Sequence, residues 1–206
     1  MRGDTGAMIV RRFQPSDRPS VYEICVRTAD AGRDARGQYC DDDLMPDIYA
    51  GPYLHLAPDL AFVVDDGDRA VGYVLGVADT AAFAADFRDT WLPLVADRHP
   101  RPVTVPTTRD ELAIETLHHP EQMVRRELAA YPAHLHIDLL PQAQGQGWGR
   151  RLIGVLLAAL AERGVPAAHL SYAPENGAAA AFYRRLGFRD VPRLPHSLWA
   201  PTDLLP

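Results

Sequence analysis

The chain has 206 residues, a length that suits one domain with a substantial hydrophobic core. Its formal charge of −6 disfavours general nucleic-acid binding, which needs a basic surface, and mildly favours a basic substrate. With two cysteines, no apolar run near the ~20 residues of a membrane span and no secretion signal in residues 1–8, the protein is expected to be cytoplasmic, without a disulfide scaffold or a membrane partner.

The first part of the chain predicts a strand, a helix and a β-hairpin. The expected elements are, in order, a strand at 9–13, a helix from Ser16-Asp17 to about Ala29, a loop at 30–47 and two strands at 61–64 and 70–78. The hairpin is indicated by Asp66-Gly67-Asp68, a strong turn sequence between two apolar runs. Cys25 lies on the apolar face of the first helix, and we expect it in the core.

Residues 80–127 are expected to form a helical insertion in a single domain that spans 1–206. Aromatic and aliphatic residues recur at helical intervals between Thr80 and Val95, and prolines interrupt the pattern at 100–106. A second helical stretch is expected from Arg109 to about Arg126. The insertion either adds packing or forms a lid over a substrate, since long excursions near a site are often functional.

A polar stripe runs along the strand that follows the insertion. Strand alternation places His134, His136 and Asp138 on one face, whereas a central strand is usually hydrophobic on both faces. These side chains form either a hydrogen-bonded core network or a general base. Histidine has the better matched intrinsic pKa for a base at neutral pH.

The loop after this strand has the composition of a phosphate-binding cradle. It reads Gln144-Gly145-Gln146-Gly147-Trp148-Gly149 and opens a helix that begins with Arg150-Arg151. Glycines allow close approach of a ligand, and a helix N-terminus attracts anions. A dinucleotide fingerprint would require glycine at position 150, and the chain has no lysine for a P-loop. Arg150 or Arg151 can pair with phosphate, although Arg151 more readily belongs to a solvated helix face.

The remaining elements complete a mixed α/β sheet. They are a strand at 168–172, a helix at 177–186, a strand near 188–191 and an edge strand at 197–200.

Two separate motifs resemble those of the GNAT superfamily of acyl-CoA-dependent N-acetyltransferases. The pyrophosphate-binding pattern Q-x-x-G-x-G matches at Gln144, Gly147 and Gly149. The pattern N-x-x-A-x-x-F-Y-x-x-x-G-F matches at Asn176, Ala179, Phe182, Tyr183, Gly187 and Phe188. The resemblance implies a mixed, mostly antiparallel sheet of six to seven strands, flanked by helices and splayed between the fourth and fifth strands.

A narrower likeness covers nearly the whole chain. Residues 21–34, 49–54 and 72–76 resemble the acetyltransferase-like domain at the C-terminus of eukaryotic O-GlcNAc hydrolases and its stand-alone bacterial relatives. The eukaryotic domains are not necessarily active enzymes. Two functions therefore stay open: direct transfer of acetyl from acetyl-CoA to a primary amine, and a catalytically weak or inactive acetyl-CoA-binding module.

The superfamily resemblance implies a set of cofactor-binding residues, with acetyl-CoA as co-substrate and no metal. Leu139 and Leu140 would hydrogen-bond pantetheine through their backbone groups, and the amides from Gln144 to Arg150 would hold the pyrophosphate. The full implied set is Leu139, Leu140, Gln144, Gly145, Gln146, Gly147, Trp148, Gly149, Arg150, Asn176, Ala179, Phe182 and Tyr183.

The same resemblance implies the catalytic residues. The phenol of Tyr183 would lie near the cofactor sulfur and protonate the departing thiolate, unless it is only a buried aromatic. Asp138 or His136 would take the proton of the acceptor amine, which is mostly charged at neutral pH. Further residues are candidates for the substrate wall, namely Asp30, Asp34, Tyr49, Tyr53 and Tyr172. The acceptor itself, a small molecule or a peptide amine, is not legible, and homodimers are common among the relatives.

A different class of protein shares the His-x-His-x-Asp triplet. Metallo-β-lactamase-like hydrolases bind two metals with H-x-H-x-D-H, and a remote alternative is a metal-dependent hydrolase that uses His134, His136 and Asp138. The last histidine of that motif is replaced by Leu139, and the other histidines form no recognisable ligand pattern. This departure favours the acetyltransferase interpretation.

Overall fold

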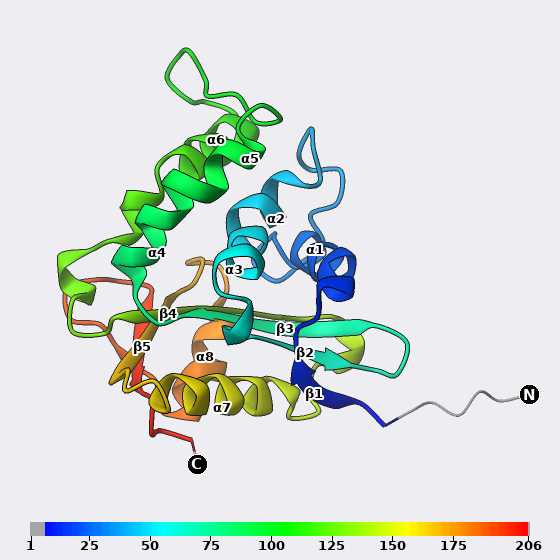
Figure 1. The fold of residues 1–206 in the computed structure, drawn as a ribbon, viewed down its shortest axis with the longest axis vertical. Helices are drawn as coiled ribbons and strands as arrows, with labels where there is room; N and C mark the ends of the chain where they lie inside the picture. Colours follow the sequence, from blue (N-terminus) through cyan, green and yellow to red (C-terminus); the bar gives the residue numbers. More distant parts are fainter. Residues whose placement is uncertain (1–6, 206) are drawn as a thin grey trace, which may run out of the picture.

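The computed structural model describes residues 7–205 and contains one seven-stranded sheet between two groups of helices (Figure 1). The strands are β1 (Ile9–Arg12), β2 (Ala61–Asp65), β3 (Ala70–Val77), β4 (Ala133–Leu139), β5 (Ala167–Ser171), β6 (Arg189–Asp190) and β7 (Ser197–Pro201). The α-helices are α1 (Arg18–Val26), α2 (Leu44–Tyr49), α3 (Gly51–Leu56), α4 (Thr80–Asp86), α5 (Leu92–Val95), α6 (Arg109–His118), α7 (Trp148–Ala161) and α8 (Gly177–Leu186).

The sheet has the order β1-β2-β3-β4-β5-β7-β6 and is antiparallel except between β4 and β5. These two strands pair only at Ala133 with Ala168 and at His134 with His169, so they part beyond that point. The predicted mixed sheet, splayed between its fourth and fifth strands, is confirmed. The gap is the place where a ligand can enter the sheet between two strands.

The prediction that residues 197–200 form an edge strand is wrong. β7 lies between β5 and β6, and Leu198 and Ala200 are fully buried there. The edge is instead the two-residue β6. The reason is topological: β5 diverges from β4 on one side and takes β7 as its antiparallel partner on the other over all five residues of β5.

Helices α7 and α8 cover one face of the sheet, and α1 to α6 lie on the other (Figure 1). The apolar stripe of α7 is fully buried at Leu152, Ile153, Leu156 and Leu160. Gly76 on β3 lets this helix approach the sheet, because a Cβ there would lie 2.6 Å from a Leu156 methyl carbon. The cradle at the start of α7 is thus attached to a rigid face.

The first part of the chain follows the prediction with two corrections. β1, α1, and the hairpin of β2 and β3 are present, and Cys25 is buried as expected. Helix α1 ends at Val26 and not at Ala29, because the hydroxyl of Thr28 bonds to the Ile24 carbonyl and Gly32 turns the chain with a φ of 89°. The expected loop at 30–47 ends earlier, where α2 begins at Leu44.

The insertion lies between β3 and β4, as predicted. Helices α4 and α5 are joined by a π-helical turn at Phe87–Trp91. The residues that recur at helical intervals are all buried, namely Phe83, Phe87, Trp91 and Val95. α6 is shorter than predicted: it ends at His118 because Pro120 cannot continue it, and short 3₁₀ turns follow at Pro120–Met123 and Arg126–Leu128. Among residues 7–205, no helix is long and apolar enough to cross a membrane.

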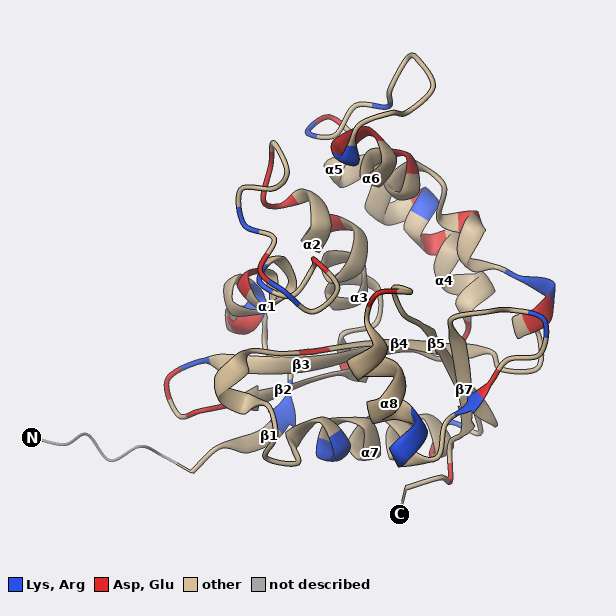
Figure 2. Cartoon of the chain, turned by 180° about the vertical axis from the view of Figure 1, so that it is seen from behind, with Lys and Arg blue, Asp and Glu red and all other residues tan. Residues whose placement is uncertain are grey.

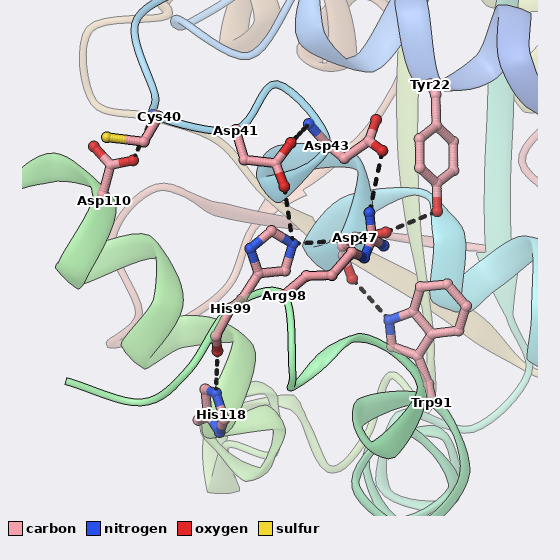
Figure 3. Close-up of polar contacts among 10 residues, drawn as sticks. All are labelled: Tyr22, Cys40, Asp41, Asp43, Asp47, Trp91, Arg98, His99, Asp110 and His118. Carbon is pink, nitrogen blue, oxygen red and sulfur yellow. Dashed lines mark hydrogen bonds and ion pairs between the residues drawn. The ribbon is translucent and has the colours of Figure 1, made fainter.

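A buried carboxylate fastens the insertion to α2 (Figure 3). Asp47 has no exposed surface, and its oxygens lie 2.5 Å from Arg98 Nη2 and 3.0 Å from His99 Nε2. The hydroxyl of Tyr22 donates to the same carboxylate, and the indole N–H of Trp91 donates to the Asp47 carbonyl. The insertion is therefore fixed to α2 by an ion-pair network and not only by apolar packing.

Candidate active site

The glycine-rich loop presents backbone N–H groups that have no partner among residues 7–205. Gly145 and Gly147 adopt φ angles of 71° and 84°, and nothing lies within 4 Å of the place where a Cβ would be. Gly147 begins α7 without a side-chain cap. In the described part of the chain, the amides of residues 145–150 donate no backbone or side-chain hydrogen bond. Free amides at the positive end of a 14-residue helix form an anion site that fits a pyrophosphate.

The two glutamines of the loop hold it in place. Gln144 Nε2 donates to the Leu139 carbonyl at 2.8 Å, and Gln146 Nε2 donates to the Gln142 carbonyl at 2.7 Å. Arg151 stacks over Trp148, 4.4 Å from the ring centre, whereas Arg150 is exposed at the loop. Arg150 is therefore the better placed of the two arginines to pair with a phosphate.

The second motif builds the junction of α8 with α7. Asn176 caps α8 by accepting a hydrogen bond from the Ala179 amide at 3.0 Å. Phe182 packs on Gly149, where a Cβ would lie 2.9 Å from the Phe182 ring. In this structure the motif residues Asn176, Ala179, Phe182 and Gly149 therefore orient α8 beside the cradle, while their predicted contacts with the cofactor stay predictions.

Leu139 and Leu140 differ in their free backbone groups. The Leu140 amide donates to the Val71 carbonyl, and the Leu140 carbonyl accepts from the Ala143 amide. The Leu140 amide is thus engaged within the sheet, and its carbonyl has one lone pair left to accept a further hydrogen bond. Alternation along β4 turns the Leu139 amide toward the gap beside β5, and the binding of pantetheine by both residues stays a prediction.

Tyr183 lies in α8 with 7% of its surface exposed. Its ring packs against Phe182 and Phe188, with centroid separations of 5.2 and 5.5 Å. Burial raises the pKa of Tyr183, and the charge of Asp138 raises it further. The phenol is therefore protonated at neutral pH, as a proton donor must be.

Asp138, whose charge raises the pKa of Tyr183, lies on β4. Its carboxylate accepts a 2.7 Å hydrogen bond from Tyr73, the residue opposite it on β3. Burial raises the pKa of Asp138 to about 6, and the hydrogen bond from Tyr73 limits that rise. A carboxylate with this pKa is ionised at neutral pH and basic enough to accept a proton.

The two histidines of the polar stripe have different surroundings. His134 is held at both ring nitrogens, by the Tyr53 hydroxyl at 2.6 Å and by Thr80 Oγ1 at 2.9 Å, and burial places its pKa well below the usual value. His136 has its pKa lowered to about 4, first by burial and then by His169. His134 therefore belongs to a core network, whereas His136 is a neutral imidazole at pH 7.

A cavity of about 370 Å³ opens at the part of the sheet where β4 and β5 separate. Its walls come from α2, α3, the insertion, β4, β5 and the start of β7. Among the lining residues are Tyr49, Tyr53, Phe87, Met123, Arg125, Leu128, His134, His136, His169, Ser171, Leu194 and His196. The volume suits a small molecule or the end of a peptide chain. The insertion lines this cavity, as the lid prediction requires.

The predicted substrate-wall residues divide into two groups. Tyr49 and Tyr53 line the cavity. Asp30, Asp34 and Tyr172 do not; Asp30 pairs with Arg33, and Asp34 pairs with Arg36 at the surface. Sequence reasoning missed the residues that β7 and the end of the insertion bring to the cavity, because no local pattern reveals which distant strands become neighbours.

The described residues contain no group of three His, Cys, Asp or Glu side chains that could hold a metal ion. His134, the first residue of the triplet, already uses both ring nitrogens in hydrogen bonds. A metal site on His134, His136 and Asp138 would have to break this network, so the geometry does not support the metal-hydrolase alternative.

The two helices on the cradle side of the sheet carry positive charge only. Neither α7 nor α8 contains an acidic residue, and their charges are arginines (Figure 2). This distribution is opposite to the net charge of the whole chain and matches an anionic ligand such as coenzyme A.

The splayed sheet, the uncapped cradle and the buried tyrosine define an acyl-CoA-binding fold of the acetyltransferase type, and comparison with known proteins agrees. A family model described as an acetyltransferase (GNAT) domain matches residues 118–190. A crystal structure of a protein called SsHAT is 53% identical, covers 95% of this chain and 98% of its own, and superimposes with a TM-score of 0.92. The chain belongs to the GNAT acetyltransferase family.

Two further comparisons place this result. Protein O-GlcNAcase of Rattus norvegicus is 27% identical over 187 residues, which is 90% of this chain. The chain spans about a fifth of the length of the curated relatives it matches, 20% in this case. The structure of yncA from Salmonella typhimurium with acetyl-CoA shares the fold at a TM-score of 0.57 and 14% identity, with 96% of this chain and 95% of that chain covered.

Proposed function

We propose that the protein transfers the acetyl group of acetyl-CoA directly to a primary amine of a small molecule or a peptide. The observation that carries this proposal is the cradle of free amides at the start of α7, next to the divergence of β4 and β5. The cradle lies at the end of β4, and the cavity opens in the same gap. Tyr183 on α8 and Asp138 on β4 would supply the acid and the base from elements that adjoin these two sites, although neither residue lines the cavity itself.

The protein residues divide the proton transfers between them. Asp138 accepts a proton from the acceptor ammonium, which leaves a neutral nitrogen that can attack. Tyr183 donates its proton to the departing CoA thiolate, and the second proton of the attacking nitrogen, lost as the amide forms, returns to the Tyr183 phenolate. Acetyl-CoA, as co-substrate, supplies the thioester whose carbon–sulfur bond breaks while the new carbon–nitrogen bond forms. Amides 145–150 hold the pyrophosphate, and the Leu139 amide fixes the pantetheine arm.

His136 is the second candidate for the base. Its imidazole lines the cavity, whereas Asp138 does not, but its pKa of about 4 makes it a weak base at neutral pH. We therefore assign proton removal to Asp138 and leave His136 as a neutral hydrogen-bond partner in the cavity.

The alternative is an acetyl-CoA-binding module that does not turn over. One observation favours it, the similarity to O-GlcNAcase. That protein is about five times as long as the segment that matches this chain. Incubation with acetyl-CoA and a panel of primary amines separates the two functions. Acetylated amine detected by mass spectrometry, together with an equal amount of free CoA thiol, supports the transferase. Tight acetyl-CoA binding without product from any amine supports the module.

A further inference from the structure

The cavity lining has an unusual charge distribution for a site that accepts an amine. None of the described residues that line it is Asp or Glu. The only lining residue with a permanent charge is Arg125, which is exposed beside the short turn Arg126–Leu128 and has no ion pair within the described residues. The cavity is therefore not acidic, although the chain as a whole has a negative net charge.

The three histidines on β4 and β5 that line the inner part of the cavity do not supply positive charge at neutral pH. The pKa values of His134, His136 and His169 are all lowered, in each case mainly by burial. His169 Nδ1 lies 2.7 Å from the Tyr131 carbonyl, so this nitrogen carries the hydrogen and Nε2 is left as an acceptor. The inner wall is thus polar but neutral, and it does not repel an ammonium group.

Two glutamates, Glu115 and Glu121, contact the lining residue His119 without lining the cavity themselves. His119 lies between Glu115, at 3.0 Å, and Glu121, at 2.6 Å, and Arg101 contacts the same cluster. Neither glutamate lines the cavity. A diamine that bound here would bury its second ammonium without a carboxylate partner, which is strongly unfavourable.

We infer that the acceptor is a small primary amine that also carries a carboxylate, and that Arg125 pairs with this carboxylate. The inference rests on the proposed function, since it names the acceptor class of that site. The planar guanidinium matches a carboxylate through two parallel hydrogen bonds. The apolar walls formed by Phe87, Met123, Leu128 and Leu194 suit an apolar side chain. An α-amino acid of this kind combines all three groups.

The test compares phenylalanine with two analogues that lack its carboxylate and with a diamine. Phenylalanine, phenylalaninamide, phenethylamine and cadaverine are titrated calorimetrically into protein saturated with CoA. We expect phenylalanine to bind at least tenfold more tightly than the other three. Equal or weaker binding of phenylalanine, or no binding of any probe, overturns the inference.

Arg125 and its neighbour provide a matched pair of variants. Arg125→Ala is expected to weaken phenylalanine binding at least tenfold and phenethylamine binding less than threefold, whereas Arg125→Lys keeps part of the affinity. Arg126→Ala removes an equally exposed charge that does not line the cavity, and it should change neither affinity. An equal loss in the Arg126→Ala and Arg125→Ala proteins overturns the role of Arg125.

Thiol release in the same samples distinguishes this inference from the proposed function. Preferential binding of phenylalanine without CoA release from any amine supports the acceptor class and contradicts transfer. Release that is as fast with phenethylamine or cadaverine as with phenylalanine supports transfer and contradicts the acceptor class.

Discussion

Asp138 and Tyr183 owe their chemical roles to their surroundings. The same burial that keeps the tyrosine protonated raises the pKa of Asp138 to about 6, so the pair is an acid and a base at one pH. The sequence indicated both residues through a strand pattern and a family motif. It did not reveal which polar residue of β4 is available, because the hydrogen bonds of His134 with Tyr53 and Thr80 connect elements far apart in the chain.

Replacement of Tyr183 by phenylalanine tests the proposed acid. The variant keeps the ring that packs on Phe182 and Phe188 and loses only the hydroxyl. We expect turnover to fall at least tenfold while the dissociation constant for acetyl-CoA changes less than about threefold. Steady-state thiol release and calorimetry measure the two quantities, and unchanged turnover would remove Tyr183 from the mechanism.

The pH dependence of turnover identifies the base. A carboxylate with a pKa of about 6 is mostly protonated at pH 5 and mostly ionised at pH 7, so kcat/KM should rise with pH, reach half its maximum near pH 6 and level off above about pH 7. Asp138→Asn should abolish this rise and lower kcat/KM by roughly 10²-fold or more. If His136 were the base, the rise would centre near pH 4, where its own pKa lies.

At the scale of elements, the cradle depends on backbone conformation more than on side chains. Gly147→Val places a side chain over the free amides and forces a residue with a φ of 84° to carry a Cβ. We expect calorimetry to detect no acetyl-CoA binding by this variant.

Gly164 provides the control for this variant. It also has a positive φ, 72°, and open space at its Cβ position, but it follows the far end of α7. Gly164→Val should carry a similar folding penalty and bind acetyl-CoA normally. Normal binding by the Gly147→Val protein would show that the pyrophosphate site is elsewhere.

The attachment of the insertion to α2 makes a second prediction for an element. Asp47→Asn removes a buried carboxylate that pairs with the half-exposed Arg98 and accepts from Tyr22, and we expect the free energy of unfolding to fall by about 1.5–3 kcal/mol. Asp43→Asn removes an exposed partner of the same arginine and should cost no more than about 1 kcal/mol. Urea denaturation measures both, and similar losses would show that the buried network does not hold the insertion.

The elements also show how far sequence patterns reach. Hydrophobic periodicity identified the hairpin, the helices of the insertion and the apolar face of α7, because each pattern is local. It failed where distant contacts decide. β7 became an inner strand because β5 needed a partner, and α2 formed in a segment whose polar composition resembles a loop.

At the scale of the whole molecule, the buried histidines make stability depend on pH. A histidine whose folded pKa lies below 6.5 contributes stability that is present above pH 6.5 and is lost as the pH falls through the folded pKa. For His136 the change from 6.5 to about 4 corresponds to about 3 kcal/mol. Asp138, whose pKa is raised, acts in the opposite direction between about pH 4 and 6.

The lowered pKa values of His134, His136 and His169 together outweigh the raised pKa of Asp138, so the free energy of unfolding should decrease in acid. We expect urea denaturation to show a lower free energy of unfolding at pH 5 than at pH 7, and a smaller difference in His136→Gln. Replacement of the exposed His55 by Gln is the control and should leave the difference unchanged. Equal stability of the unaltered protein at the two pH values would contradict the neutral, buried state of these histidines.

The charge of the whole molecule is divided between the two faces of the sheet. The arginines of α7 and α8 lie on the cofactor side, and most acidic residues lie in the other helices and loops (Figure 2). The net charge of the chain does not reveal this division. It suggested a basic substrate, but a sum over the whole chain does not describe the charges that line one cavity.

The central claim is that one site binds acetyl-CoA and delivers its acetyl group to an amine. The most direct measurement is a calorimetric titration of the protein with acetyl-CoA, followed in the same preparation by thiol release with primary amines. We predict saturable binding of one acetyl-CoA per chain and release that requires the amine. Binding without release would contradict catalysis, and no binding would contradict the cradle itself.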